Sequence, residues 1–241
     1  MRVQGAKRNP KLVDTTTVTV NIPNGEKARI HNVFIIDASG SMSGSKYDNA
    51  INGVNEVLLD IKKDTDTINT VTIVEFEGRK ISRRLDMENA SSLPDKYREM
   101  GTGGMTPLNQ AVGETLDYIL KQRNSKFAKE DKVLVNVFTD GGENSSSGKY
   151  SNGYVLGEFI KTLEQDGFTV TFMGTQTEVQ YATATLNLTA SNTLVHTNTA
   201  ASVKTSYDTT LRARKMYSKS VSLGEDVKTA FYSKTVESDN K

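Results

Sequence analysis

Five residues with oxygen-bearing side chains occur where the sequence pattern predicts a strand end or a helix start. They are Asp37, Ser39, Ser41, Thr106 and Asp140. The first three follow the apolar run of VFIIDASGSMSG, the fourth lies in GTGGMTPLNQ, and the fifth lies in FTDGGEN. Each has an ordinary structural explanation, because aspartate and serine are common in turns and threonine before proline is a good helix cap. Their convergence on one sheet edge would point to chemistry instead.

The chemistry that these side chains share is coordination of a hard cation. Hydroxyl and carboxylate oxygens without imidazole or thiolate ligands favour magnesium, calcium or manganese over zinc or copper. Alternate side chains of an extended turn point the same way, so Asp37, Ser39 and Ser41 can meet at one point, and Gly40 lets the backbone bend around it. With only two carboxylates, a bound divalent cation would keep an affinity for a further anion.

Alternating strand and helix patterns predict the scaffold that would bring these residues together. Four nearly continuous apolar runs, rich in β-branched residues, are typical of strands buried on both faces of a parallel sheet. They are residues 32–38, 71–76, 132–140 and 168–174. Helical stripes, with apolar residues three and four positions apart, lie between them around Tyr47–Ile61, Leu108–Ile119 and Leu156–Leu163. Gly78 joins two strand-like runs, the second of which alternates Ile81 and Leu85 with arginines, and this predicts a hairpin to an antiparallel edge strand.

The predicted fold class is therefore α/β, a doubly wound, mostly parallel sheet with one antiparallel edge strand and helices on both faces. Ligands bind such sheets at the carboxyl ends of the strands. A short helix at 179–186, a strand at 193–197 and a helix at 200–217 are expected to complete a domain that spans 29–217. Residues 1–28 would be an extension with a candidate edge strand, and 218–241 a polar tail of disorder-prone composition.

Composition excludes several classes of function. The 241 residues carry a formal net charge of +1, from 30 basic and 29 acidic side chains, so bulk charge does not favour nucleic acid or an anionic membrane. The chain has no cysteine, which rules out disulfides and thiolate sites. No apolar run is long enough to insert into a bilayer, and MRVQGAKRNPK lacks the apolar core of a signal peptide, so a cytoplasmic location is expected.

The segment GSMSGSK imitates a phosphate-binding loop, but its spacing argues against one. Such a loop needs four residues between its glycines, and then lysine followed by serine or threonine. Here Gly40 and Gly44 are one residue too close, and Ser45 precedes Lys46. The GTGG segment at 101–104 follows no predicted strand, so it is poor support for a dinucleotide site.

Two hydrolytic chemistries lack a necessary group. A phosphatase of the haloacid dehalogenase type would carry a second aspartate two residues after Asp37, where this chain has Ser39. A serine nucleophile would need a base, and the two histidines, His31 and His196, are expected in the core or at an edge of the sheet. A metal-dependent hydrolase of phosphoesters or peptides on a similar fold remains the alternative to a binding module.

The three motifs together resemble the metal-ion-dependent adhesion site (MIDAS) of von Willebrand factor type A (VWA) domains, with all five positions filled in the family's order. The resemblance implies that Ser39, Ser41 and Thr106 would touch the metal through their hydroxyls. It implies that Asp37 and Asp140 would act directly or through water, and that a glutamate or aspartate of a partner protein would complete the shell. The metal would be Mg²⁺ or Mn²⁺, with Ca²⁺ as a further candidate.

The resemblance covers about residues 30–217 and departs from the family pattern at the two extensions and at Met105, where a small residue is common. It implies a Rossmann-like fold and a non-enzymatic adaptor or assembly component. Intracellular bacterial and viral members resemble accessory subunits of AAA+ ATPases or parts of large assemblies. From its Gly, Ser and Asn content, the loop at 141–153 is expected to form a mobile rim of the binding surface. The helix at 200–217 is a candidate for coupling to the site.

Overall fold

The computed structural model describes residues 27–98, 101–126, 128, 130–197, 199–225, 227 and 231–233. Its centre is a six-stranded sheet in the order β3-β2-β1-β4-β5-β6. The strands are β1 (Arg29–Asp37), β2 (Ile68–Glu77), β3 (Lys80–Asn89), β4 (Lys132–Phe138), β5 (Phe168–Gly174) and β6 (Thr193–Val195). Only the β2–β3 pair is antiparallel among these strands, which confirms the predicted fold class and its antiparallel edge strand.

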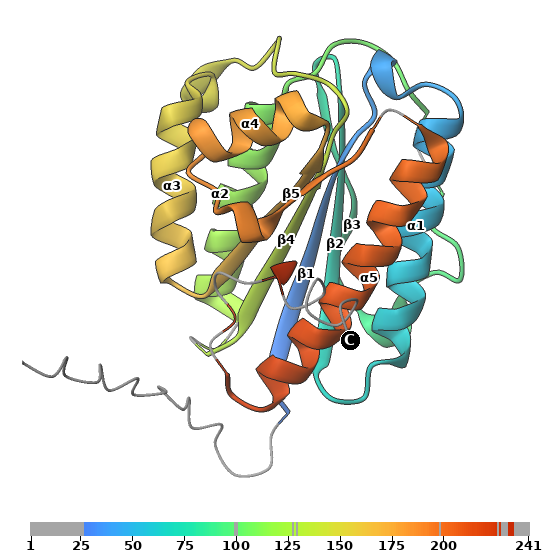
Figure 1. Ribbon diagram of the computed structural model, residues 1–241. Helices are drawn as coiled ribbons and strands as arrows, with labels where there is room; N and C mark the ends of the chain where they lie inside the picture. Colours follow the sequence, from blue (N-terminus) through green and yellow to red (C-terminus); the bar gives the residue numbers. More distant parts are fainter. Residues whose placement is uncertain are drawn as a thin grey trace, which may run out of the picture.

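Helices cover both faces of the sheet (Figure 1). On one face lie α1 (Ser45–Lys63) and α5 (Ala200–Ser222), and on the other lie α2 (Leu108–Lys126), α3 (Gly153–Gln165) and α4 (Gln176–Ala184). Successive side chains of a strand point to opposite faces, so β1 serves two cores. Val33 and Ile35 pack in the core that contains α2 and α3, while Phe34 and Ile36 pack in the core that contains α1.

Close contact between α1 and α5 depends on a glycine. A Cβ atom on Gly53 of α1 would lie 2.2 Å from the ring of Tyr207 on α5, well inside van der Waals contact. The missing side chain therefore lets the Tyr207 ring lie against the α1 backbone. This contact joins the two helices in the first half of α5, which is the half nearer the carboxyl ends of the strands (Figure 1).

Helix α5 continues to Ser222, beyond the expected end at residue 217. The apolar stripe also continues, because Tyr217 and Val221 are buried in a third core together with Ile30 and Leu134. Phe231 and Tyr232 join that core, and the Tyr232 N–H donates to the Ser191 carbonyl at 2.9 Å. The candidate edge strand of the N-terminal extension falls at residues before Lys27, outside the described part of the chain. Within that described part, no helix combines the length and apolar character needed to cross a bilayer.

Candidate metal centre

The candidate site lies where the strand order of the sheet reverses. The chain runs from β1 outward to β2 and β3, and later adds β4, β5 and β6 on the other side of β1. The carboxyl ends of β1 and β4 therefore form the switch point, where doubly wound sheets bind ligands. Asp37 ends β1, and Asp140 follows the end of β4 by two residues. The parallel register pairs Ile36 with Phe138, which brings the two strand ends level.

Asp37 is fully buried and held by neutral donors. Its Oδ1 accepts the Ser39 N–H at 2.7 Å, and its Oδ2 accepts the Thr139 hydroxyl at 2.6 Å. Burial raises the pKa of Asp37 from 3.8 to about 6, because these hydrogen bonds offset the loss of water only in part and Asp140 adds a further negative charge. Asp37 is thus a buried carboxylate whose ionised form would gain from a nearby cation.

A chain of polar contacts links the two serines to Asp140. The hydroxyls of Ser39 and Ser41 lie 3.1 Å apart, and Ser41 Oγ donates to Asp140 Oδ1 at 2.9 Å. The other oxygen, Asp140 Oδ2, forms an ion pair with Lys46 Nζ from the first turn of α1. Each oxygen of Asp140 therefore already has a partner within the chain.

Thr106 lies close to the other side chains of the group, and the space between them is open because residue 141 is glycine. A Cβ atom on Gly141 would lie 3.0 Å from Ser41 Oγ, 3.1 Å from Thr106 Oγ1 and 3.6 Å from Asp37 Oδ2. Three oxygens thus surround one point beside Gly141: one from the end of β1, one from the turn that follows β1, and one from the loop before α2. The structure therefore brings all five sequence-predicted residues together at one edge of the sheet.

The loop after Asp140 supports the start of α2. Glu143 Oε2 accepts the Asn109 N–H at 2.7 Å, and Ser146 Oγ accepts the Gln110 N–H at 2.9 Å. Asn144 Oδ1 accepts the Thr106 N–H at 2.8 Å. These contacts cap the first turn of α2, so the capping role considered for Thr106 belongs to the loop side chains. They also fasten this part of the loop, which was expected to form a mobile rim, to the helix.

Sequence reasoning missed three residues that shape the site, namely Thr139, Lys46 and Glu143. Thr139 directly precedes Asp140 and becomes a neighbour of Asp37 through the β1–β4 register, which a single sequence does not give. Lys46 was considered only as part of an imperfect phosphate loop. A signal existed for it, because the first helical turn after an acidic strand end is within reach of that end.

Three of the five side chains at this edge are hydroxyls, so the group differs from a cluster of histidines and carboxylates. Among the described residues there is no group of three or more histidines, aspartates and glutamates that could hold a metal. The histidines belong to the interior, as expected. His31 Nδ1 lies 2.7 Å from Thr70 Oγ1, and burial lowers the pKa of His31 to about 4. His196 stacks on Phe138 with ring centroids 5.4 Å apart. Two carboxylates with three hydroxyls fit a hard cation and leave room for an outside ligand.

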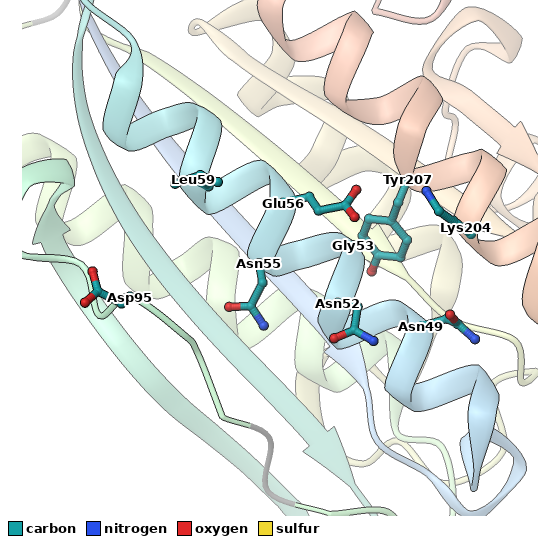
Figure 2. A pocket seen from close by; sticks show the side chains of 9 residues that line it. All are labelled: Asn49, Asn52, Gly53, Asn55, Glu56, Leu59, Asp95, Lys204 and Tyr207. Carbon is teal, nitrogen blue, oxygen red and sulfur yellow. The ribbon is translucent and has the colours of Figure 1, made fainter.

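A separate groove lies on the outer surface of α1 (Figure 2). It has a volume of about 420 Å³, and its lining includes three asparagines from α1 and two residues from α5. They are Asn49, Asn52, Asn55, Lys204 and Tyr207. None of the five candidate metal ligands lines this groove, so it is distinct from the candidate centre at the carboxyl ends of β1 and β4.

Comparison with solved structures shows where this fold occurs elsewhere. Proximal thread matrix protein 1 from the mussel byssus, with a zinc-occupied MIDAS motif, aligns with a TM-score of 0.53 at 14% identity, over 78% of this chain and 46% of that one. The pilus adhesin SpaC from Lactobacillus rhamnosus GG, in an open conformation, aligns with a TM-score of 0.57 at 12% identity, over 83% of this chain and 30% of that one. At these identities the likeness shows the fold alone, and this chain spans less than half of either protein.

The family is identified by a match of the amino-acid sequence to a family model. No match was found among curated protein sequences. The von Willebrand factor type A domain family matches residues 33–211, which run from β1 into α5 and include all five candidate ligands. The match covers well over half of the chain. The chain therefore belongs to the von Willebrand factor type A domain family.

Proposed function

We propose that this protein is a non-enzymatic binding module that uses a bound divalent cation to capture an acidic side chain of a partner protein. The observation that carries the proposal is the arrangement around Gly141, where hydroxyls of Ser41 and Thr106 and a carboxylate oxygen of Asp37 face one point. Side chains that merely formed turns and caps would have no reason to face a common space. In this proposal the MIDAS is complete and comprises Asp37, Ser39, Ser41, Thr106 and Asp140.

The donor set indicates the kind of cation. Carboxylate and hydroxyl oxygens would hold Mg²⁺ or Mn²⁺, with Ca²⁺ as a further candidate. The cation would supply an open coordination position for a carboxylate oxygen. The chain's own residues set up that position: Thr139 and the Ser39 amide orient Asp37, and Asn144 fixes the backbone of Thr106. The neighbour with a zinc-occupied MIDAS motif supports a divalent cation, although its metal differs from those expected here.

Other parts of the proposal stay predictions. The adhesin neighbour is consistent with a protein partner. A role as an adaptor or assembly component, association with an AAA+ ATPase and a cytoplasmic location are expectations from the sequence, as are the boundaries at 29 and 217. Turnover of phosphoester or peptide substrates would favour the alternative of a metal-dependent hydrolase, and the binding module should show none.

Titration calorimetry with Mg²⁺ and Mn²⁺ tests the proposal. Asp37→Ala should abolish metal binding, because it removes one of the two anionic groups of the site, and should leave the fold intact. Thr106→Ala should lower partner affinity more than metal affinity, because it removes one neutral ligand. The matched control is Asp117→Ala on the surface of α2, whose carboxylate pairs with Lys149. Equal binding by wild type and Asp37→Ala, or no binding by wild type with an acidic partner present, would sink the proposal.

A glycine pair tests the geometry separately from the charge. Gly141→Ala should strongly weaken metal binding, because its methyl group would enter the space that Ser41, Thr106 and Asp37 face. The neighbouring Gly142→Ala is the control, because the nearest atom to its Cβ would be Glu178 Oε1, at 4.0 Å. If Gly141→Ala kept the wild-type metal affinity, the oxygens around this point would not be the ligands.

A further inference from the structure

Lys46 is a cationic side chain inside the candidate centre. It lies in the first turn of α1, and its Nζ forms an ion pair with Asp140 Oδ2. The Asp140 side chain is only 1% exposed, while that of Lys46 is 22% exposed. The ammonium of a partly exposed side chain therefore reaches a buried carboxylate.

The two carboxylates of the centre differ in their partners. Asp37 accepts only neutral donors in the described structure, from Ser39 and Thr139. Asp140 accepts one neutral donor, Ser41, and one cation, Lys46. Asp140 is thus compensated by the chain, and a metal that binds its Oδ2 must compete with Lys46 for that oxygen.

We propose that Lys46 has two opposite effects on this centre: it lowers the affinity for the metal and raises the affinity for an acidic partner. This inference rests on the proposed function. It competes with a divalent cation for Asp140 and so weakens metal binding. Once the cation is bound, the same ammonium stands at the entrance and attracts the acidic side chain of the partner.

Charge explains the second effect. Asp37, Asp140 and Lys46 together carry a net charge of −1 at neutral pH. With a divalent cation bound, the local charge becomes +1, which favours a carboxylate ligand. Without Lys46 the loaded centre would be neutral, and the partner would be held by the open coordination position alone. Because attraction between unit charges is stronger in a partly buried site than in water, the difference should be measurable.

The test is Lys46→Met, which removes the charge and keeps a long apolar stem. Titration calorimetry with Mn²⁺ alone should show affinity about five- to tenfold higher than wild type, because no ion pair must be broken first. At saturating Mg²⁺, an NMR titration with the probe peptide acetyl-Gly-Glu-Gly amide should show affinity lowered by about the same factor. The peptide with Gln in place of Glu reports non-specific binding.

Two further variants control the test. Lys62→Met lies on the same helix, and its side chain is 25% exposed and paired with Asp95, so it removes an equal charge without touching the centre. It should match wild type in both titrations. Lys46→Arg keeps the charge and should stay close to wild type in both, which preserves the test if Lys46→Met does not fold.

The outcomes separate this inference from the proposed function. If wild type binds Mn²⁺ and Lys46→Met binds it no more tightly, the competition is refuted while the metal centre stands. If Lys46→Met binds the Glu peptide as well as wild type does, the attraction is refuted. An arginine variant that behaves like the methionine variant would also overturn the role of charge. If no variant and no wild type binds metal, both proposals fail.

Discussion

Two pairs of aspartates occupy opposite edges of the same sheet, and the fold treats them differently. At the carboxyl edge, the described partners of Asp37 are all neutral, and Asp140 forms an ion pair with Lys46. At the amino edge, the buried guanidinium of Arg214 on α5 bonds to Asp64 Oδ2 at 2.8 Å and to Asp60 Oδ2 at 3.1 Å. Ser218 adds a hydroxyl to Asp64 at 2.6 Å. Both aspartates of the amino edge thus share a buried cationic partner, whereas at the carboxyl edge of the described structure only Asp140 has a cationic partner and Asp37 has none.

The pKa values follow this difference. Burial raises the pKa of Asp37 to about 6, and the neutral donors only limit the rise. At Asp64 burial also acts to raise the pKa, but the Ser218 hydroxyl and the Arg214 charge outweigh it and lower the pKa to about 2. Asp64 thus receives a cationic partner from the chain, whereas Asp37 has only neutral donors among the described residues. The contrast supports a binding role for the carboxyl edge without reference to any relative.

The largest effect is expected from breaking the ion pairs of Arg214 with Asp60 and Asp64. Arg214→Met should lower the free energy of unfolding by about 3 kcal/mol, because it leaves two carboxylates without their buried partner. Metal affinity should not change. Lys215→Met is the control, because Lys215 pairs with Asp60 from an exposed position and should cost less than about 1 kcal/mol. Urea denaturation and Mn²⁺ calorimetry on both variants would measure this, and a loss of metal binding in Arg214→Met would contradict the independence of the two edges.

The next effect is a pair of opposite pH dependences in metal-free protein. Asp37 has a folded-state pKa of about 6, above its ordinary 3.8, so its contribution to stability is greatest below pH 4 and is lost as pH rises through 6. Asp64 has a lowered pKa of about 2, so its contribution is present above pH 4 and is lost as pH falls through 2. For Asp37 the change amounts to at most about 3 kcal/mol, two pKa units.

Denaturation in EDTA at several pH values would separate the two groups. Asp37→Asn should remove the fall in stability between pH 4 and 6, and Asp64→Asn should remove the fall between pH 4 and 2. Magnesium affinity of the wild type should also decline below pH 6, since proton and cation compete for Asp37. A wild-type curve that Asp37→Asn leaves unchanged would show that this carboxylate is not strained by burial.

The sequence predicted the carboxyl edge of the sheet but not the ion pairs at its amino edge, and the reason is physical. Apolar runs ending in Asp37 and near Asp140 predicted both the sheet and the edge at which these residues meet, because strand periodicity and turn chemistry are local. The partner of Asp64 was not predictable, because Arg214 is 150 residues away along the chain and meets it only after α5 packs on α1. The same holds for Glu143, whose capping of α2 depends on the path of a loop.

A smaller effect is expected at the residue that orients Asp37. Thr139→Val keeps the shape of a fully buried side chain and removes the hydroxyl that donates to Asp37 Oδ2. Mn²⁺ affinity should fall about tenfold, as for other residues that orient a metal ligand. The matched control is Thr171→Val in β5, a buried threonine whose hydroxyl bonds to Asn136. It should lose about 1 kcal/mol of stability, and metal affinity should remain. Equal metal affinity in the two variants would remove Thr139 from the centre.

The smallest effect concerns α5, which touches both edges. Its later half is fixed at the amino edge by Arg214 and Ser218. Its earlier half is close to the candidate centre, because the Tyr207 ring lies 5.3 Å from that of Phe138, which precedes Thr139 and Asp140 on the same chain segment. If ligand capture shifts Asp140, the displacement can pass through Phe138 to Tyr207, but the ion pairs should hold the later half in place.

Coupling of this kind would therefore be confined to one half of the helix. With Mg²⁺ and an acidic peptide, hydrogen exchange should change at residues 200–210 and stay constant at residues 211–222. The comparison needs three samples: EDTA, Mg²⁺ alone, and Mg²⁺ with the peptide. Arg214→Met should extend the change into the later half, because it removes the contact that holds that half against α1. Identical exchange in all three wild-type samples would mean that the centre is a static clamp, and exchange changes along the whole helix would mean that the amino edge does not anchor it.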